Sequence, residues 1–130
     1  MPVTVPVNRN YDPVYGEAVE MSPLVRRVLA RNPSPFTFHG TGTYLVGRQA
    51  LAVIDPGPDD GDHLAAILAA AGNAPITHIL VTHTHADHSP LAAALKAKTG
   101  ALTYAFGPHG SLRGGDHVRL EEAGDTAFVP

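Results

Sequence analysis

The sequence contains no cysteine among its 130 residues, so it can form neither a disulfide nor a thiolate metal site. Aromatic residues make up only 6% of the chain and tryptophan is absent, so valine, isoleucine, leucine and alanine must fill the core. The formal net charge is −3, without a block of like charges, which argues against nucleic-acid binding through bulk charge. Because cysteine is absent, any bound metal must have histidine, carboxylate or backbone ligands.

Long apolar runs are also missing. No run approaches the roughly 18 residues that indicate a membrane span. Residues 1–21 lack the basic start and apolar core of a secretory signal. We therefore expect a cytoplasmic protein with no membrane partner. The length favours about one domain, and a hydrophobic content of 44% is sufficient for a core.

The sequence from residue 36 onward alternates between strand and helix patterns, which predicts an α/β fold with some parallel pairing. Residues 1–35 are rich in proline and asparagine and predict an irregular or edge segment, although 24–31 fit either a strand or a helical turn. The expected order is strands within 36–47, a strand at 50–54, a helix within 59–72 ending at Gly72, a buried strand at 76–82, a helix at 91–99 after a Ser89-Pro90 cap, and a strand at 101–106.

Three histidines and an aspartate follow the predicted strand at 76–82, in the segment "LVTHTHADHSP". Ligands of open α/β sheets gather at the carboxyl ends of strands, and His and Asp suit zinc and related divalent ions. Residues two apart in an extended segment point the same way, so His83 and His85 can bind one ion. Asp87 and His88 can then face a second ion. Two such ions about 3.5–4 Å apart can clamp the attacking and leaving oxygens of a hydrolysis.

The segment "THTHADH", preceded by "GTGTYLVG" and "AVIDPGP", resembles the signature of the metallo-β-lactamase superfamily. The resemblance covers about residues 36–106, the expected metal-site core, and is strongest for the hydrolase branch that includes glyoxalase II, β-lactamase-like proteins and a metal-dependent endoribonuclease. It implies an αββα sandwich, of which residues 1–130 are the amino-terminal half: a mixed sheet with helices on one face.

The resemblance also implies roles for single residues. His83 and His85 would bind the first zinc ion, and Asp87 and His88 the second. Asp87 would in addition orient the nucleophilic water. Asp55 would support the site from beneath, although an aspartate before Pro-Gly is equally typical of a turn.

The family's second half supplies a third histidine, a bridging aspartate and a last histidine. The sequence after His88 offers no such set, because His109 and His117 do not lie in the Gly-His context that the family uses. We therefore expect a poor hydrolase on its own. A half-sandwich also leaves a sheet edge and part of a face uncovered, which favours self-association.

Three functions are consistent with these patterns. The first is a metal-dependent hydrolase acting through a metal-bound hydroxide on an ester, thioester, lactam or phosphodiester, in a small-molecule or nucleotide-type substrate. The second is a non-enzymatic metal-binding or interaction module. The third is a flavodiiron-type oxidoreductase, a branch that typically has glutamate at the position of His85. Three other histidines have weaker assignments: His39 lines the substrate side or a strand surface, His63 lies on the solvent face of its helix, and His78 is structural.

Overall fold

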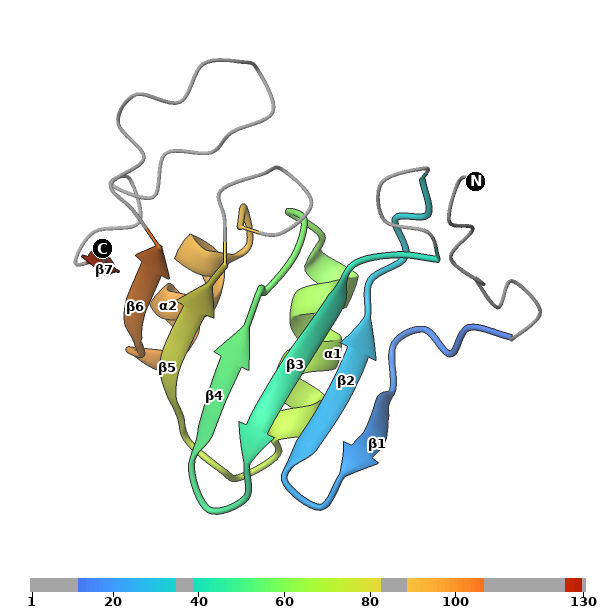
Figure 1. Ribbon diagram of the computed structural model, residues 1–130, viewed down its shortest axis with the longest axis horizontal. Helices are drawn as coiled ribbons and strands as arrows, with labels where there is room; N and C mark the ends of the chain where they lie inside the picture. The colour runs from blue at the N-terminus through green and yellow to red at the C-terminus, as the bar shows by residue number, and fades with distance from the viewer. Residues whose placement is uncertain (1–11, 35–38, 83–88, 107–125, 130) are drawn as a thin grey trace, which may run out of the picture.

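The computed structural model describes residues 12–34, 39–82, 89–106 and 126–129, and a single seven-stranded sheet connects them (Figure 1). The strands lie in the sheet in the same order as in the sequence. The elements are β1 (Ala18–Ser22), β2 (Val25–Leu29), β3 (Gly42–Gly47), β4 (Leu51–Ile54), α1 (Gly61–Ala71), β5 (Ile76–Val81), α2 (Ala92–Thr99), β6 (Leu102–Phe106) and β7 (Thr126–Val129).

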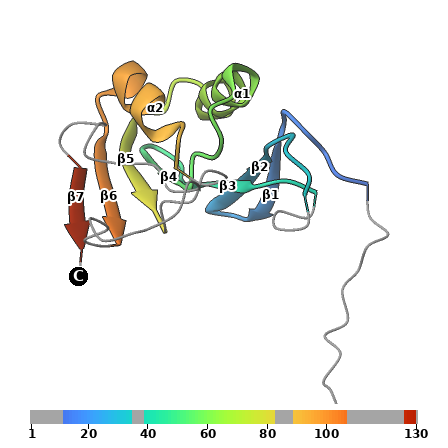
Figure 2. The same cartoon turned by 90° about the horizontal axis from the view of Figure 1, so that it is seen from above.

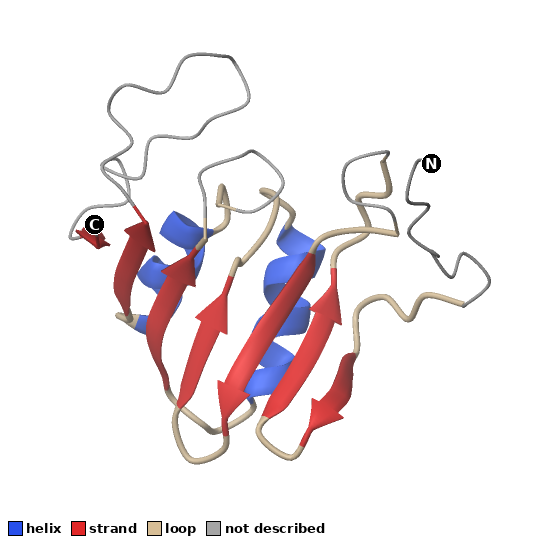
Figure 3. Ribbon diagram, in the orientation of Figure 1, coloured by secondary structure: helices blue, strands red, loops and turns tan. Residues whose placement is uncertain are grey.

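The sheet is mixed. Strands β1 to β4 pair antiparallel, whereas β4, β5, β6 and β7 pair parallel. Helix α1 connects β4 to β5 and α2 connects β5 to β6, and both helices lie on the same face of the sheet (Figures 2 and 3). The predicted mixed sheet with helices on one face is thus confirmed. Because β4, β5 and β6 run in the same direction, their carboxyl ends lie at one edge of the sheet.

Residue types at the ends of the helices explain where they begin and end. The Asp60 side chain caps α1 by accepting a hydrogen bond from the backbone N–H of Asp62, at 2.9 Å. Gly72 ends α1 with a φ of 59°, and Gly100 ends α2 in the left-handed conformation. Helix α2 begins later than its Ser89-Pro90 signal predicts, because a turn in which the Ser89 carbonyl accepts from Ala92 comes first.

The hydrophobic core lies between the sheet and the two helices. Each sheet strand from β3 to β6 turns alternate side chains toward the helices, and these are the buried ones. As expected, aliphatic side chains fill this layer: the largest fully buried ones are Leu45, Leu51, Ile67, Ile79, Leu91, Leu95, Val28 and Val53.

The amino-terminal segment contributes more than an edge. Of the two alternatives for residues 24–31, the structure has the strand, β2, which pairs with β1 on one side and β3 on the other. Strand β1 lies at one edge of the sheet, and β7 lies at the other. Of the two helices in the described part of the chain, neither has the length and apolar character needed to cross a membrane.

Both helices lie on one side of the sheet, and no described element covers the other face (Figure 2). Apolar side chains on that face are exposed. The expectation of a fully buried strand at 76–82 was wrong, because only the helix-facing side chains of β5 are buried. Leu80 is 36% exposed and Leu102 is 49% exposed. We call this surface the open face; its paired rows are Tyr44, Ile54, Leu80 and Tyr104, then Val46, Ala52, His78 and Leu102.

We propose that this 130-residue chain, by itself, associates with a second copy through the open face. Sedimentation velocity at micromolar concentration should show a dimer or larger species, because burying this apolar surface is favourable. The double variant Leu80→Glu/Leu102→Glu should shift the population toward monomer. The matched pair Ala65→Glu/Ala69→Glu, on the exposed side of α1, should not. A monomeric parent chain, or an equal shift in both pairs, would contradict the proposal.

Candidate metal centre

Asp55 links the carboxyl ends of β4 and β5. Its backbone N–H donates to the Leu80 carbonyl at 2.8 Å, which extends the strand pairing by one residue. Its buried carboxylate accepts two hydrogen bonds from Thr82: one from the backbone N–H at 2.8 Å and one from the hydroxyl at 2.7 Å. Bonds to an ionised acceptor are stronger than neutral ones, so the position of Thr82 is well fixed.

The predicted metal ligands His83, His85, Asp87 and His88 lie outside the described residues, so their assignment stays a prediction. Within the described ranges, no group of three or more His, Asp or Glu side chains is suitably placed to hold a metal ion. The structure does describe what precedes and follows the motif: Thr82 on one side and Ser89 to Leu91 on the other.

Residues 55–57, which we call the anchor loop, contact both flanks of the motif. Asp55 holds Thr82, and the Gly57 carbonyl accepts a hydrogen bond from the Leu91 backbone N–H at 3.1 Å. The anchor loop is buried, as is Ser89. One buried turn thus bonds to Thr82, the residue before the segment 83–88, and to Leu91, which follows it.

Asp55 holds an unusual backbone conformation, with a φ of 51°. Non-glycine residues rarely occupy this left-handed region, and aspartate is among those that tolerate it best. The residue therefore shapes the turn before Pro56-Gly57, and its carboxylate also bonds to Thr82. Of the two alternatives that the sequence left open, the turn is present in the structure, and the supporting role beneath a metal site stays a prediction.

His63 was placed wrongly on the solvent face of α1. Its side chain is only 4% exposed, and its Nε2 atom lies 2.8 Å from the Thr43 hydroxyl oxygen. That hydroxyl in turn donates to the Asp55 carbonyl at 2.7 Å. The missed signal is helical spacing: His63 precedes the buried Ile67 by four residues and so shares its face.

Burial determines the protonation of His63. Loss of solvation lowers the pKa of its imidazole, while the negative charge of Asp60 and the Pro56 carbonyl act in the opposite direction. The neutral form is therefore favoured in the folded protein.

The other two described histidines lie apart from the anchor loop contacts. The His78 ring is exposed on the open face and stacks on Tyr104, with ring centroids 5.9 Å apart. The His39 carbonyl accepts a hydrogen bond from the Tyr15 hydroxyl at 2.5 Å. Neither contact brings these imidazoles to Asp55 or Thr82.

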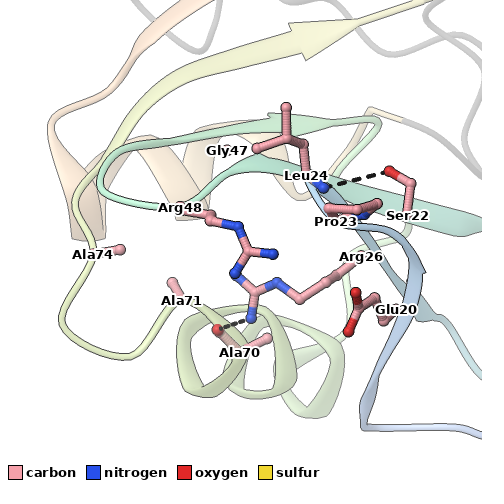
Figure 4. Close-up of a pocket in the computed structure, with 10 residues that line it drawn as sticks. All are labelled: Glu20, Ser22, Pro23, Leu24, Arg26, Gly47, Arg48, Ala70, Ala71 and Ala74. Carbon is pink, nitrogen blue, oxygen red and sulfur yellow. Dashed lines mark hydrogen bonds between the residues drawn. The ribbon is translucent and has the colours of Figure 1, made fainter.

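A cavity of about 300 Å³ lies at the opposite end of the sheet, beside the turns that join β1 to β2 and β3 to β4 (Figure 4). The Arg26 guanidinium donates to the Ala70 carbonyl at its wall, at 2.8 Å, and Arg48 also lines it. Its lining contains neither histidine nor aspartate, so it does not reproduce the chemistry of the motif.

The fold and the arrangement at this edge define a metallo-β-lactamase-like domain. A sequence model of the metallo-beta-lactamase superfamily matches residues 37–128, and the chain belongs to this family. Members of the superfamily usually bind metal ions, and zinc is common among them.

Two curated proteins and one solved structure illustrate the similarity. The chain is 41% identical to an atrochrysone carboxyl ACP thioesterase of Cryptosporiopsis sp. (strain 8999), over 59% of this chain and 25% of that protein. It is 40% identical to the beta-lactamase-like protein 2 homolog of Caenorhabditis elegans, over 53% of this chain and 25% of that protein. A mutant metallo-beta-lactamase from Cronobacter sakazakii superposes with a TM-score of 0.57 at 28% identity, covering 72% of this chain and 35% of that one.

The matched region thus spans about a quarter of the length of these curated relatives.

We expect the stability of the chain to fall as the pH decreases below the ordinary histidine pKa of about 6.5. Because the folded-state pKa of His63 is lowered, the unfolded state binds more protons in this window, and protonation then favours unfolding. Urea unfolding at pH 7.5 and pH 5.5 should show this loss. His63→Gln should make it smaller, whereas His78→Gln, which removes an exposed imidazole, should leave it as it is. An unchanged pH dependence in His63→Gln would refute the assignment.

Proposed function

We propose that the full-length protein is a metal-dependent hydrolase and that His83, His85, Asp87 and His88 hold its metal ions. The observation that carries this proposal is the anchor loop, which bonds to Thr82 before the motif and to Leu91 after it. These flanks lie at the carboxyl ends of parallel strands, where α/β proteins place their ligands. Membership of the metallo-β-lactamase superfamily supports the same assignment.

The donor set fits zinc. Three imidazoles and one carboxylate offer nitrogen and oxygen ligands, and a chain without cysteine offers no thiolate. We assign His83 and His85 to the first ion and Asp87 and His88 to a second. When bound, such an ion lowers the pKa of a water ligand to about 7 and so supplies a nucleophile at neutral pH. The remaining ligands would come from other parts of the full-length protein.

The residues of this chain would have separate roles in catalysis. Asp87 would orient the attacking water through its carboxylate, while the two histidines before it fix the first ion. Asp55 and Thr82 would keep the end of β5 in place, so that His83 enters the site at a fixed angle. Catalysis of this kind depends on positioning, since a small displacement of a ligand is costly in rate.

The substrate class that we favour is a thioester. The relative that is 41% identical carries the name of a thioesterase, and an ester, lactam or phosphodiester remains an outcome of the substrate screen. A non-enzymatic metal-binding module is the second candidate, favoured by the open face, which no described element covers. The cytoplasmic location of the protein stays a prediction from the sequence.

Zinc content tests the ligand assignment. The double variant His83→Ala/His85→Ala should lose the zinc that the parent protein retains, because two of its proposed ligands are gone. Elemental analysis after dialysis measures the result. The control His109→Ala/His117→Ala also removes two imidazoles, and it should retain zinc. Unchanged zinc in the first pair would disprove the assignment.

Turnover tests the role of Asp87. In the full-length protein, Asp87→Ala should lower kcat by about 100-fold or more, in the range of lost proton-transfer and orienting groups, with a smaller change in KM. Steady-state kinetics on a thioester substrate give both constants. Asp59→Ala, at an exposed aspartate outside the site, should leave kcat near the parent value. If Asp87→Ala also retains it, Asp87 is not central to the reaction.

A further inference from the structure

His63 is a buried polar residue for which the proposed metal set has no use. It lies in the first turn of α1, the helix that follows the anchor loop. Helix α1 begins at the edge of the sheet where β4 ends (Figure 1). Burying an imidazole without a hydrogen-bond partner costs free energy, so its contact with the Thr43 hydroxyl is informative. Thr43 belongs to β3 and is itself fully buried.

The hydrogen bonds of Thr43 have a fixed direction. The Asp55 carbonyl can only accept, so the Thr43 hydroxyl must use its one hydrogen to donate to it, over 2.7 Å. The Nε2 atom of His63, 2.8 Å from the same hydroxyl oxygen, must then be the donor to Thr43. The result is a hydrogen-bond relay: His63 donates to Thr43, and Thr43 donates to the backbone carbonyl of Asp55.

The backbone of Asp55 needs such support. A non-glycine residue in the left-handed region costs about 1–3 kcal/mol and persists only where its surroundings fix it. The Leu80 carbonyl holds its N–H, Thr82 bonds to its carboxylate, and Thr43 holds its carbonyl.

The His63 ring also abuts the other end of the anchor loop. A Cβ atom on Gly57, which has a φ of 94°, would lie only 3.1 Å from His63 Nε2. The ring therefore packs against the backbone of Gly57, whose carbonyl holds Leu91. The His63 side chain thus contacts Gly57 directly and Asp55 through the Thr43 hydroxyl.

We propose that His63 is a positioning residue for the metal centre. Through Thr43 it supports Asp55, which bonds to Thr82 before the segment 83–88. By packing against Gly57 it supports the residue that bonds to Leu91 after this segment. This inference rests on the proposed function, because the segment matters only if it carries the ligands. His63 touches neither the metal nor the substrate. Its contribution is to keep the anchor loop in a single shape, so that Thr82 and Leu91 stay at a fixed separation.

The test compares two replacements of His63 in the full-length protein. Gln places an amide N–H close to the position of Nε2 and can still donate to Thr43, whereas Leu has similar bulk and no donor. His63→Leu should weaken zinc affinity about 10- to 100-fold, as is typical for residues that orient metal ligands. His63→Gln should restore affinity to within about threefold of the parent. Competition with a chromophoric zinc chelator measures both.

A core variant separates positioning from general destabilisation. Ile67→Ala removes buried bulk from the same face of α1, one turn further on, and should lower the free energy of unfolding by about 2–5 kcal/mol while leaving zinc affinity unchanged. If Ile67→Ala and His63→Leu lower zinc affinity equally, or if His63→Leu leaves it unchanged, the inference is wrong. A parent protein that binds no zinc would instead overturn the proposed function.

Thr43 provides a second test that does not require His63→Leu to fold. Thr43→Val keeps the shape of the side chain and removes the hydroxyl, so it should lower zinc affinity as His63→Leu does. Thr43→Ser keeps the hydroxyl and should retain affinity. The absorption spectrum of the cobalt-substituted protein should change in Thr43→Val and not in Thr43→Ser. Identical affinity and spectra in the two Thr43 variants would overturn the relay.

Discussion

The two hydrogen bonds from Thr82 to the Asp55 carboxylate are the contact on which the candidate site depends. They connect the carboxyl ends of β4 and β5 at the residue where the motif segment begins. Because the acceptor is charged and buried, its loss would leave donors unpaired at this edge, which is costlier than the loss of a surface bond. The left-handed turn at Asp55 lies in the same loop, in which the Gly57 carbonyl accepts a hydrogen bond from the Leu91 backbone N–H and the Asp55 carbonyl accepts one from Thr43, the partner of His63.

The two faces of the sheet have different roles. The helix-covered face contains the hydrophobic core and also the polar pair of Thr43 and His63, so the support for the site lies within the best-packed layer. The open face contains apolar side chains of β3 to β6 that remain in contact with solvent. In the αββα arrangement that the family resemblance implies, a second sheet would cover this face, and such a layer would come from the rest of the full-length protein.

Local sequence signals predicted much of this fold, but they could not predict contacts between residues that are far apart in the sequence. Asp60, Gly72 and Gly100 mark helix ends through their own conformations and caps, so these boundaries can be recognised from neighbouring residues alone. The bond between Thr43 and His63 joins residues 20 apart in the sequence, and no local pattern reports it. The exposure of Leu80 depends on what packs against β5, which its apolar composition does not specify. For the ligands themselves, residue type and spacing are the information available, since 83–88 lie outside the described residues.

The order of the strands has a consequence for how the chain folds. Each strand pairs with the one before it in the sequence, so a chain synthesised from its amino terminus can extend the sheet one strand at a time. Contacts between neighbours in sequence also reduce the entropy lost in closing long loops, which favours rapid folding. The anchor loop and His63 both precede the motif in the sequence, so their part of the support can form before the histidines leave the ribosome.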